Sequence, residues 1–513
     1  MSAENREIEL KFEADAAGLA AALASPLLAA AGPETPQRSL SSIYYDTADQ
    51  KLRQNRMALR MRRSGRTVPV MALKWPQHAG SGPFARGEAE VRAPGGKLDL
   101  SLFDPTIAAE LQRILGDAPL EPQFETRIKR RSRTLHVGGA EIEVAFDQGE
   151  IVAGDRRTPI MEVELELKSG AAADMYAFAA RVAADLPMRL SVVSKAEQAF
   201  MFADGLIARP VRAQSIVLPS QLTCDEAIAF LLPHLLDHFL SNFAALRQGD
   251  DPEAIHQMRV ALRRLRTILG ILQKELPCPE FLALRAEAGR IATGLGDARE
   301  TDVFQQLVAE DLRELLARHG VFDDLARLVE QRRAAVYRDA RALIDGPATT
   351  IFAVSLQAFV SRRGWRATSG ADGLQRLTEP AEAFARQAFD RLYRRAQKRA
   401  KGLEAQTEEQ RHDLRIALKN LRYCSEFFWS IFDHERATKK FVRATSAMQD
   451  LLGAHNDAAG AQHVLSKLDA ADAAGFELAK GLVLGWCAHG GASSSKEVRK
   501  GWKAFRRADP FWE

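Results

Sequence analysis

The chain has 513 residues, more than one ordinary hydrophobic core accommodates, so about two to four domains are expected. Hydrophobic residues make up 46% and charged residues 27%, as in soluble globular proteins, and the net charge of +4 predicts no particular partner. The four cysteines form no C-x-x-C pair, the first residues are charged, and no apolar run approaches the ~18 residues that cross a membrane. We therefore expect a cytoplasmic protein with reduced thiols and no membrane partner.

Two periodicities divide the chain. Up to about residue 205, apolar and polar residues alternate with period two, which indicates strands. Beyond about residue 218, Leu/Ala/Arg-rich stretches with a period near 3.6 indicate helices. The proline-containing segment between them reads as a linker. We predict an α+β multidomain protein with a strand-rich domain at 1–205, a linker at 206–217 and an all-helical domain at 218–513.

Several predicted strands of the first half carry charges on one face. In the first of them, Glu7, Glu9 and Lys11 share a face, because successive side chains of a strand point to opposite sides. The predicted strands are 7–12, 59–62, 70–74, 88–91, 141–147 and 162–168. One such strand is typical of a solvated sheet face. Repeated charged faces, rich in carboxylates that repel unless cations lie among them, favour a closed antiparallel barrel with a charged interior.

An apolar barrel exterior requires covering helices, and 16–28, 107–115 and 174–184 are amphipathic candidates. The mixed charges of the interior suit one class of ligand. Arginine and lysine bind the oxygens of a triphosphate, while carboxylates hold Mg²⁺ or Mn²⁺, which bridge to phosphate. Cations and metal together are suited to phosphoryl transfer, with water as the attacking group in a hydrolase.

An ordered series of motifs resembles the CYTH superfamily, also called triphosphate tunnel metalloenzymes. The motifs are Glu7-x-Glu9-x-Lys11, Tyr44-Tyr45-Asp46-Thr47, Leu59-Arg60-Met61-Arg62, Ala72-Leu73-Lys74, Arg86-Gly87-Glu88-Ala89-Glu90, Phe146-Asp147-Gln148-Gly149, Glu162-Val163-Glu164 and Ser194-Lys195. The resemblance implies a closed antiparallel β tunnel with flanking helices.

The same resemblance implies roles for the tunnel residues. The triphosphate clamp would consist of Lys11, Arg60, Arg62, Lys74 and Lys195, with Arg130 as an additional member. The metal-side carboxylates would be Glu7, Glu9, Asp147, Glu162 and Glu164, with Glu88 and Glu90 as further tunnel acids. Because Glu166 shares a face with Glu162 and Glu164, spacing leaves open which of these three bind metal.

The helical half contains a cationic stripe that occurs twice. At about 100° per residue, His256, Arg259, Arg263 and Arg266 fall within one narrow arc, with Arg264 beside them. The same spacing returns in His412, Arg415, Lys419 and Arg422. The string Leu295-Gly296-Asp297-Ala298-Arg299, which follows the first stripe, has an echo at 452–457. We infer two copies of one helical unit, at about 218–360 and 375–513.

These stripes predict an anion site. No Glu at i−4 neutralises the arginines, and no aromatic residues interleave with them, which disfavours single-stranded nucleic acid. A lone histidine among arginines is more suited to donating hydrogen bonds to phosphate than to ligating metal. Further basic residues, Arg394, Arg395 and Lys398, lie on another predicted helix.

The quoted helical strings resemble the CHAD domain. This resemblance implies two pseudo-symmetric four-helix bundles and binding of inorganic polyphosphate through a basic cavity. In the second copy the pair Arg263-Arg264 becomes Lys419-Asn420, which predicts weaker binding by that half.

Together the two resemblances imply a metal-dependent inorganic triphosphatase whose helical domain binds polyphosphate, located in the cytoplasm or at polyphosphate granules. The alternatives are a non-catalytic polyphosphate-binding scaffold, an adenylate cyclase and a nucleic-acid-binding protein. The motifs leave open whether the substrate is triphosphate, a nucleoside triphosphate or thiamine triphosphate.

Overall fold

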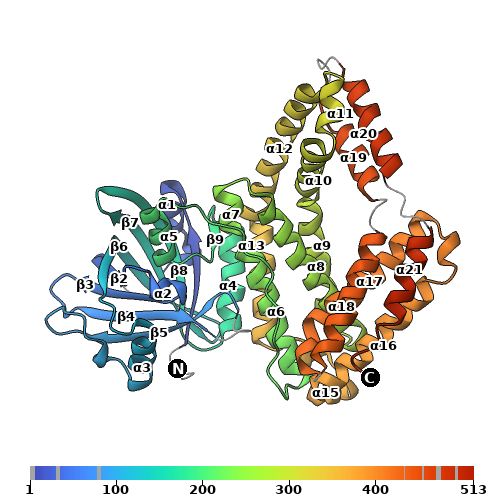
Figure 1. Ribbon diagram of the computed structural model, residues 1–513. Helices are drawn as coiled ribbons and strands as arrows, with labels where there is room; N and C mark the ends of the chain where they lie inside the picture. Colours follow the sequence, from blue (N-terminus) through green and yellow to red (C-terminus); the bar gives the residue numbers. More distant parts are fainter. Residues whose placement is uncertain are drawn as a thin grey trace. The chain divides into compact units, whose positions relative to one another are not determined.

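The computed structural model describes residues 6–29, 35–77, 82–432, 434–452, 456–469, 475–490 and 495–513. They form two compact units (Figure 1). The first, called the tunnel unit below, comprises Met1–Val211, Leu232–Ala254 and Ile344–Gly364. The second, called the helical unit, comprises Arg212–Leu231, Ile255–Leu343 and Trp365–Glu513. The tunnel unit therefore includes two segments from the helical half of the sequence, while the predicted domain limits at 205 and 218 stay a prediction.

The tunnel unit is built on one antiparallel sheet that closes on itself. Its strands are β1 (Arg6–Glu13), β2 (Arg38–Asp46), β3 (Ala58–Ser64), β4 (Val70–Pro76), β5 (Ala85–Arg92), β6 (Glu121–Val137), β7 (Ala140–Ala153), β8 (Arg156–Ser169) and β9 (Arg189–Ser191). Their order is β5-β4-β3-β2-β6-β7-β8-β1-β9, and pairing of β1 with β5 closes the barrel. The short β9 pairs with the end of β1, from Lys11 to Glu13. The predicted closed antiparallel barrel is confirmed.

The register places the charged faces of successive strands on the inside. Across β1 and β8, Lys11 lies opposite Glu164 and Glu9 lies opposite Glu166. Across β7 and β8, Asp147 lies opposite Glu162. Directly opposed residues of antiparallel strands point to the same side of a sheet. By the same rule, the side chains of six further opposed pairs also point inward. These pairs are Arg130–Asp147, Tyr44–Arg60, Arg60–Ala72, Ala72–Glu90, Lys74–Glu88 and Glu7–Arg86.

Helices cover the apolar outside of the barrel, as predicted. Helix α3 (Pro105–Leu115) begins at a proline, is capped by the Asp104 side chain and packs on the outward residues of β3, β4 and β5. Helices α1 (Ala16–Ala24) and α4 (Ala172–Asp185) pack on the β6–β8 side. The predicted helix 16–28 is interrupted, because the chain leaves α1 at Ser25 and Pro26–Leu28 form a separate 3₁₀ turn.

One end of the barrel is filled with apolar side chains. The inward residues Tyr44, Phe124, Ile151 and Ile160 pack against α5 (Lys195–Asp204), chiefly against Phe200. The Ser194 side chain caps this helix, so its first residue, Lys195, adjoins the charged part of the interior. The charged interior is therefore closed at the α5 end.

Segments from the second half of the sequence complete the tunnel unit. They are the later part of α6 (Cys224–Leu240), α7 (Phe243–Gln248) and α13 (Pro347–Ser361). Helix α13 packs against α4 and β9. Within the described residues, no single helix is long and apolar enough to cross a membrane, although the pair Phe322–Asp345 and Pro347–Ser361, bent by 45°, meets that test jointly.

The helical unit repeats one order of helices. The helices of the second half of the chain not yet introduced are α8 (Pro252–Glu275), α9 (Pro279–Gly294), α10 (Gly296–Gln306), α11 (Arg313–Arg318), α12 (Phe322–Asp345), α14 (Trp365–Thr368), α15 (Ala371–Thr378), α16 (Ala381–Arg399), α17 (Glu408–Phe428), α18 (Glu435–Leu451), α19 (Asn456–Ser466), α20 (Phe476–Gly490) and α21 (Ser495–Arg506). The series α8-α9-α10 corresponds to α17-α18-α19, which supports the inferred repeat, although part of the echo at 452–457 lies outside the described residues.

The two repeats also share a hydrophobic core. In the second repeat, α17 packs on α16 and α18, and α21 packs on α18. A separate core joins Phe304 and Leu312 of the first repeat to Val464 and Val483 of the second. Helices α19 and α20 thus pack on α10 and α11 instead of on their own repeat alone.

Candidate active site and cationic helix faces

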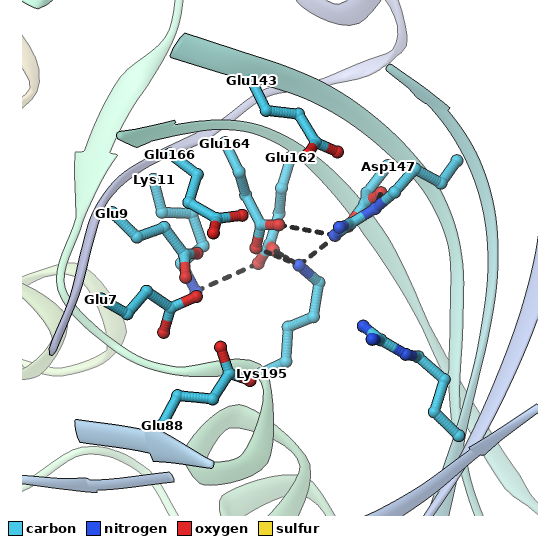
Figure 2. Close-up of polar contacts among 12 residues, drawn as sticks. Glu7, Glu9, Lys11, Glu88, Glu143, Asp147, Glu162, Glu164, Glu166 and Lys195 are labelled. Carbon is cyan, nitrogen blue, oxygen red and sulfur yellow. Dashed lines mark hydrogen bonds and ion pairs between the residues drawn. The ribbon is translucent and has the colours of Figure 1, made fainter. Parts of the chain in front are cut away.

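Three buried carboxylates converge inside the barrel. Asp147 on β7 and Glu162 and Glu164 on β8 each offer an oxygen within 4.8 Å of the others (Figure 2). Lys195 Nζ lies 2.9 Å from both Asp147 Oδ2 and Glu162 Oε2 and also contacts Glu164. Arg130 donates two hydrogen bonds to Asp147, of 2.7 and 2.6 Å, and one of 2.6 Å to Glu164. These three carboxylates are called the acidic triad below.

Within the triad, Glu164 is kept ionised by neighbouring cations. Burial alone would raise the pKa of Glu164, but Lys195 and Arg130 together hold it well below its usual range. Glu162 is 1% exposed, with Lys11 Nζ 3.2 Å from Oε1. In the described part of the chain, neither Glu162 oxygen has a hydrogen bond. Buried carboxylate oxygens that converge in this way are suited to ligating a hard cation.

A second cluster surrounds Lys74 on β4. Its Nζ lies 2.7 Å from Glu7, 3.4 Å from Glu9 and 3.5 Å from Glu88. Burial and then the charge of Glu164 raise the pKa of Glu9 to about 7. Glu9 also shares a side-chain hydrogen bond with Glu164, so a proton on Glu9 relieves repulsion between the two carboxyls.

Two arginines of β3 face the same interior. Arg62 Nη2 lies 2.7 Å from Glu90, and Arg60 Nη2 lies 3.4 Å from Glu88 and 3.7 Å from Glu90. Burial lowers the pKa of Arg62, and the neighbouring Arg60 lowers it further, since two guanidinium groups repel each other. An anion between these arginines would relieve that repulsion.

Glu166 makes its ion pair with a lysine outside the triad. Glu166 pairs with Lys168 at 2.6 Å, and Lys168 also lies 3.2 Å from Glu143. Glu166 is half-buried, and burial raises its pKa. The sequence-predicted clamp and acids thus lie in one interior. Glu162 and Glu164 group with Asp147 (Figure 2), whereas Glu166 pairs with Lys168.

Two motif residues that received no role from the sequence also shape this interior. Tyr44, inside the quoted Tyr-Tyr-Asp-Thr motif, shares a side-chain hydrogen bond with Arg60. Arg86, inside Arg-Gly-Glu-Ala-Glu, donates a 2.9 Å hydrogen bond to the Val192 carbonyl. The motifs mark both positions in the sequence, but only the structure shows what the two side chains contact.

The helical unit brings its two cationic stripes together. Arg263 Nη1 on α8 lies 3.5 Å from the Tyr423 hydroxyl on α17, and Thr267 Oγ1 lies 3.4 Å from Asn420 Oδ1. Burial and then the charges of four arginines lower the pKa of Lys419 to about 7. Those arginines are Arg263, Arg415, Arg422 and Arg259, from both stripes.

The other predicted residues of the helical unit occupy different surroundings. Arg299 acts electrostatically on Arg259, whose pKa is lowered mainly by burial and then by Arg263. Arg264 is 2% exposed, with Glu426 3.4 Å away, which favours a role in joining α8 to α17. The remaining predicted residues are half-buried or exposed: His256 and Arg266 on α8, Arg394, Arg395 and Lys398 on α16, and His412 on α17.

Comparisons with known proteins match two families to successive parts of the chain. The model of the CYTH domain matches residues 5–200, and the model of the CHAD domain matches residues 231–466. An inorganic triphosphatase of Haemophilus influenzae is 31% identical over 167 residues, which are 32% of this chain and 45% of that protein. The match thus spans less than half of that relative's length.

Two further proteins extend the comparison. An uncharacterized protein of Mycobacterium tuberculosis is 24% identical over 508 residues, covering 92% of this chain and 91% of its own length. The crystal structure of the CHAD domain from the plant Ricinus communis is 30% identical with a TM-score of 0.50, covering 58% of this chain and 97% of the plant domain. On these grounds the chain belongs to the proteins in which a CYTH domain is followed by a CHAD domain.

Proposed function

We propose that this protein is a metal-dependent inorganic triphosphatase, which converts triphosphate and water to pyrophosphate and phosphate. The observation that carries the proposal is the acidic triad, set among buried lysines and arginines in one closed interior. The CYTH match and the partial similarity to an inorganic triphosphatase support it.

The proposed metal ligands are Asp147, Glu162 and Glu164. Their converging oxygens fit a hard cation such as Mg²⁺ or Mn²⁺. When bound, this metal would neutralise charge on the phosphate oxygens. Glu7 and Glu9, on the neighbouring strand, pair with Lys74, whereas Glu166 lies with Lys168 and is a weaker candidate ligand.

The proposed clamp consists of the cations that now pair with tunnel acids. Lys195, Arg130 and Lys11 contact the triad, Lys74 contacts its own acidic cluster, and Arg60 and Arg62 contact Glu88 and Glu90. Each can exchange a carboxylate oxygen for a phosphate oxygen, with the arginines binding through two parallel donors. Such positioning and charge neutralisation supply most of the catalysis in phosphoryl transfer.

The helical domain is proposed to bind inorganic polyphosphate at the joined stripes. Lys419 lies among four arginines of the two stripes, whose charges lower its pKa after burial, and a polyanion would relieve this repulsion. Tyr423, which adjoins Arg422 in the second stripe, is buried and cannot stack on a base, which favours a polyanion without bases over single-stranded nucleic acid. A location in the cytoplasm or at polyphosphate granules stays a prediction.

A substrate panel tests the catalytic proposal. Purified protein is given triphosphate, longer polyphosphate, ATP or thiamine triphosphate with Mg²⁺ or Mn²⁺, and phosphate, pyrophosphate and cyclic AMP are measured. We expect triphosphate to have the highest kcat/KM, and Arg60→Ala to lower it by about 100-fold or more.

The exposed Arg318→Ala on α11 provides a control for loss of one arginine. Cyclic AMP as the main product would favour an adenylate cyclase. Polyphosphate binding without hydrolysis of any substrate would favour a scaffold protein.

A further inference from the structure

The wall segment Arg189–Lys195 carries several contacts of the charged interior. It begins as β9, and its carbonyl groups accept hydrogen bonds from interior cations: Val193 from Lys11 and Val192 from Arg86. It ends at Lys195, which contacts the acidic triad. A shift of this segment would therefore move three cations of the interior together.

A residue from the CHAD-matched part of the sequence holds this segment. Arg247 on α7, within the tunnel unit, donates a 3.0 Å hydrogen bond from Nη2 to the Leu190 carbonyl. Its Nε donates a 2.7 Å hydrogen bond to Asp345, and its Nη1 lies 3.9 Å from Glu13. The side chain is only 12% exposed, so these contacts are shielded from solvent.

Charged side chains of both signs surround Arg247. Arg189, the first residue of β9, lies 3.8 Å from Glu13 and 3.8 Å from Asp345. Glu13 is the last residue of β1, whose inward row includes Lys11. Two arginines and two carboxylates thus connect the end of β1, the start of β9 and the α12–α13 junction. The planar guanidinium of Arg247 makes three different contacts at once, which a lysine cannot reproduce.

We propose that Arg247, oriented by Asp345, is a positioning residue that fixes the Arg189–Lys195 segment and through it the placement of Lys195 and Lys11. The catalytic part of this inference rests on the proposed triphosphatase function. Arg247 does not contact the triad itself. Instead, it acts through the wall segment, in the same way as outer contacts orient the ligands of a metal site. Loss of such contacts typically costs about 10- to 100-fold in affinity or activity.

The CHAD-matched sequence would thus support the barrel interior in addition to binding anions. Both Arg247 and Asp345 lie inside residues 231–466, yet they pack within the tunnel unit. The second domain of the sequence thus supplies part of the support for the catalytic interior of the first.

Amide hydrogen exchange of the full-length protein tests the positioning directly. We expect Arg247→Ala to accelerate exchange in peptides covering 189–195, Asp345→Asn to do so less, and Arg247→Lys to lie between wild type and Arg247→Ala. Arg333→Ala is the matched control: Arg333 is also 12% exposed and pairs with an aspartate, Asp302, at 3.0 Å, but it belongs to the helical unit. Exchange at 189–195 should be unchanged in this control.

Activity provides the second readout. We expect Arg247→Ala to lower kcat/KM for triphosphate by about 10- to 100-fold, with partial recovery in Arg247→Lys and no change in Arg333→Ala. Should Arg247→Ala not fold, Arg247→Lys and Asp345→Asn give the same comparison. Unchanged exchange at 189–195, or faster exchange with wild-type kcat/KM, would overturn the positioning role. A wild-type protein without triphosphatase activity would instead contradict the proposed function, and the exchange data would still decide whether Arg247 fixes the segment.

Discussion

At the scale of single residues, the two candidate sites solve the problem of buried charge in opposite ways. In the barrel, Asp147, Glu162 and Glu164 are surrounded by cations, because an uncompensated buried charge costs several kcal/mol. On the helices, Lys419 lies among arginines. The barrel can therefore exist with its charges paired, whereas the joined stripes carry an excess of positive charge that an anion would compensate.

The Lys419 cluster predicts a dependence of stability on pH. The pKa of Lys419 falls from an ordinary 10.5 to about 7 in the fold, chiefly through burial. Between these values the unfolded chain binds more protons than the folded one, so this lysine makes the free energy of unfolding rise with pH. Below pH 7 it is charged in both states, and its repulsion is fully present.

Lys419→Met should therefore be more stable than wild type at pH 6, with a difference that shrinks as the pH rises toward 10. Denaturant unfolding at several pH values measures this difference. Lys440→Met, at an exposed position on α18, is the control and should show no such trend. A difference between wild type and Lys419→Met that is constant across this range would contradict the cluster.

At the scale of elements, the alternation of charged and apolar residues predicted the barrel strands, because its period is a local property of the sequence. The grouping of the acids was not predictable, since it depends on strand register. Only the pairing of β7 with β8 places Asp147 beside Glu162 and Glu143 beside Glu166. The position of Lys195 at the start of a helix was also missed, although the capping Ser194 precedes it in the sequence.

Gly87 in the Arg-Gly-Glu-Ala-Glu motif is required by a close contact between two strands. Gly87 on β5 lies opposite Trp75 on β4, and a Cβ at position 87 would overlap the indole ring. Trp75 is 4% exposed and packs in the core beneath α3. The adjacent pair Lys74–Glu88 faces the interior, so this close contact helps set the spacing of two tunnel-lining strands.

Gly87→Ala should destabilise the protein by about 1–3 kcal/mol, the usual cost of overpacking a core. Trp75→Leu removes the ring and carries its own cost in lost packing. Because the clash requires both groups, the double variant should lose less stability than the two single variants added together. Thermal or denaturant unfolding of all four proteins measures the coupling, and strictly additive losses would refute the proposed contact.

At the scale of the whole molecule, the sequence order and the structural units differ. Helix α13 belongs to the helical half of the sequence but packs against α4 and β9 in the tunnel unit. Its buried residues lie on most of its circumference, which indicates that the helix is covered on several sides. This pattern does not indicate which elements cover it. Long-range packing of this kind has no local signal, so α13 and Arg247 were assigned from the sequence to the helical domain alone.

A chain shortened to the predicted domain 1–205 should therefore be less stable than the full protein. Its α4 would lose the cover of α13, including the hydrogen bond between Tyr176 and Gln357. A loss of about 2 kcal/mol would lower the Tm of a domain of this size by about 4–8 °C.

Hydrogen exchange should become faster in α4 of the shortened chain, while the β3–β4 pair, which α3 covers, provides an internal control. Equal protection of α4 in the long and short chains would show that α13 does not stabilise the barrel.

The most direct measurement of the central claim is the release of phosphate from triphosphate by wild type and Glu162→Gln as free Mg²⁺ or Mn²⁺ is varied. We expect equal amounts of phosphate and pyrophosphate from wild type, no turnover with a chelator, and a loss of about 100-fold or more in Glu162→Gln at any metal concentration. Glu143→Gln, which removes a carboxylate paired with Lys168 outside the triad, should remain close to wild type. Turnover that persists in the chelator, or wild-type turnover in Glu162→Gln, would contradict a metal site built on the acidic triad.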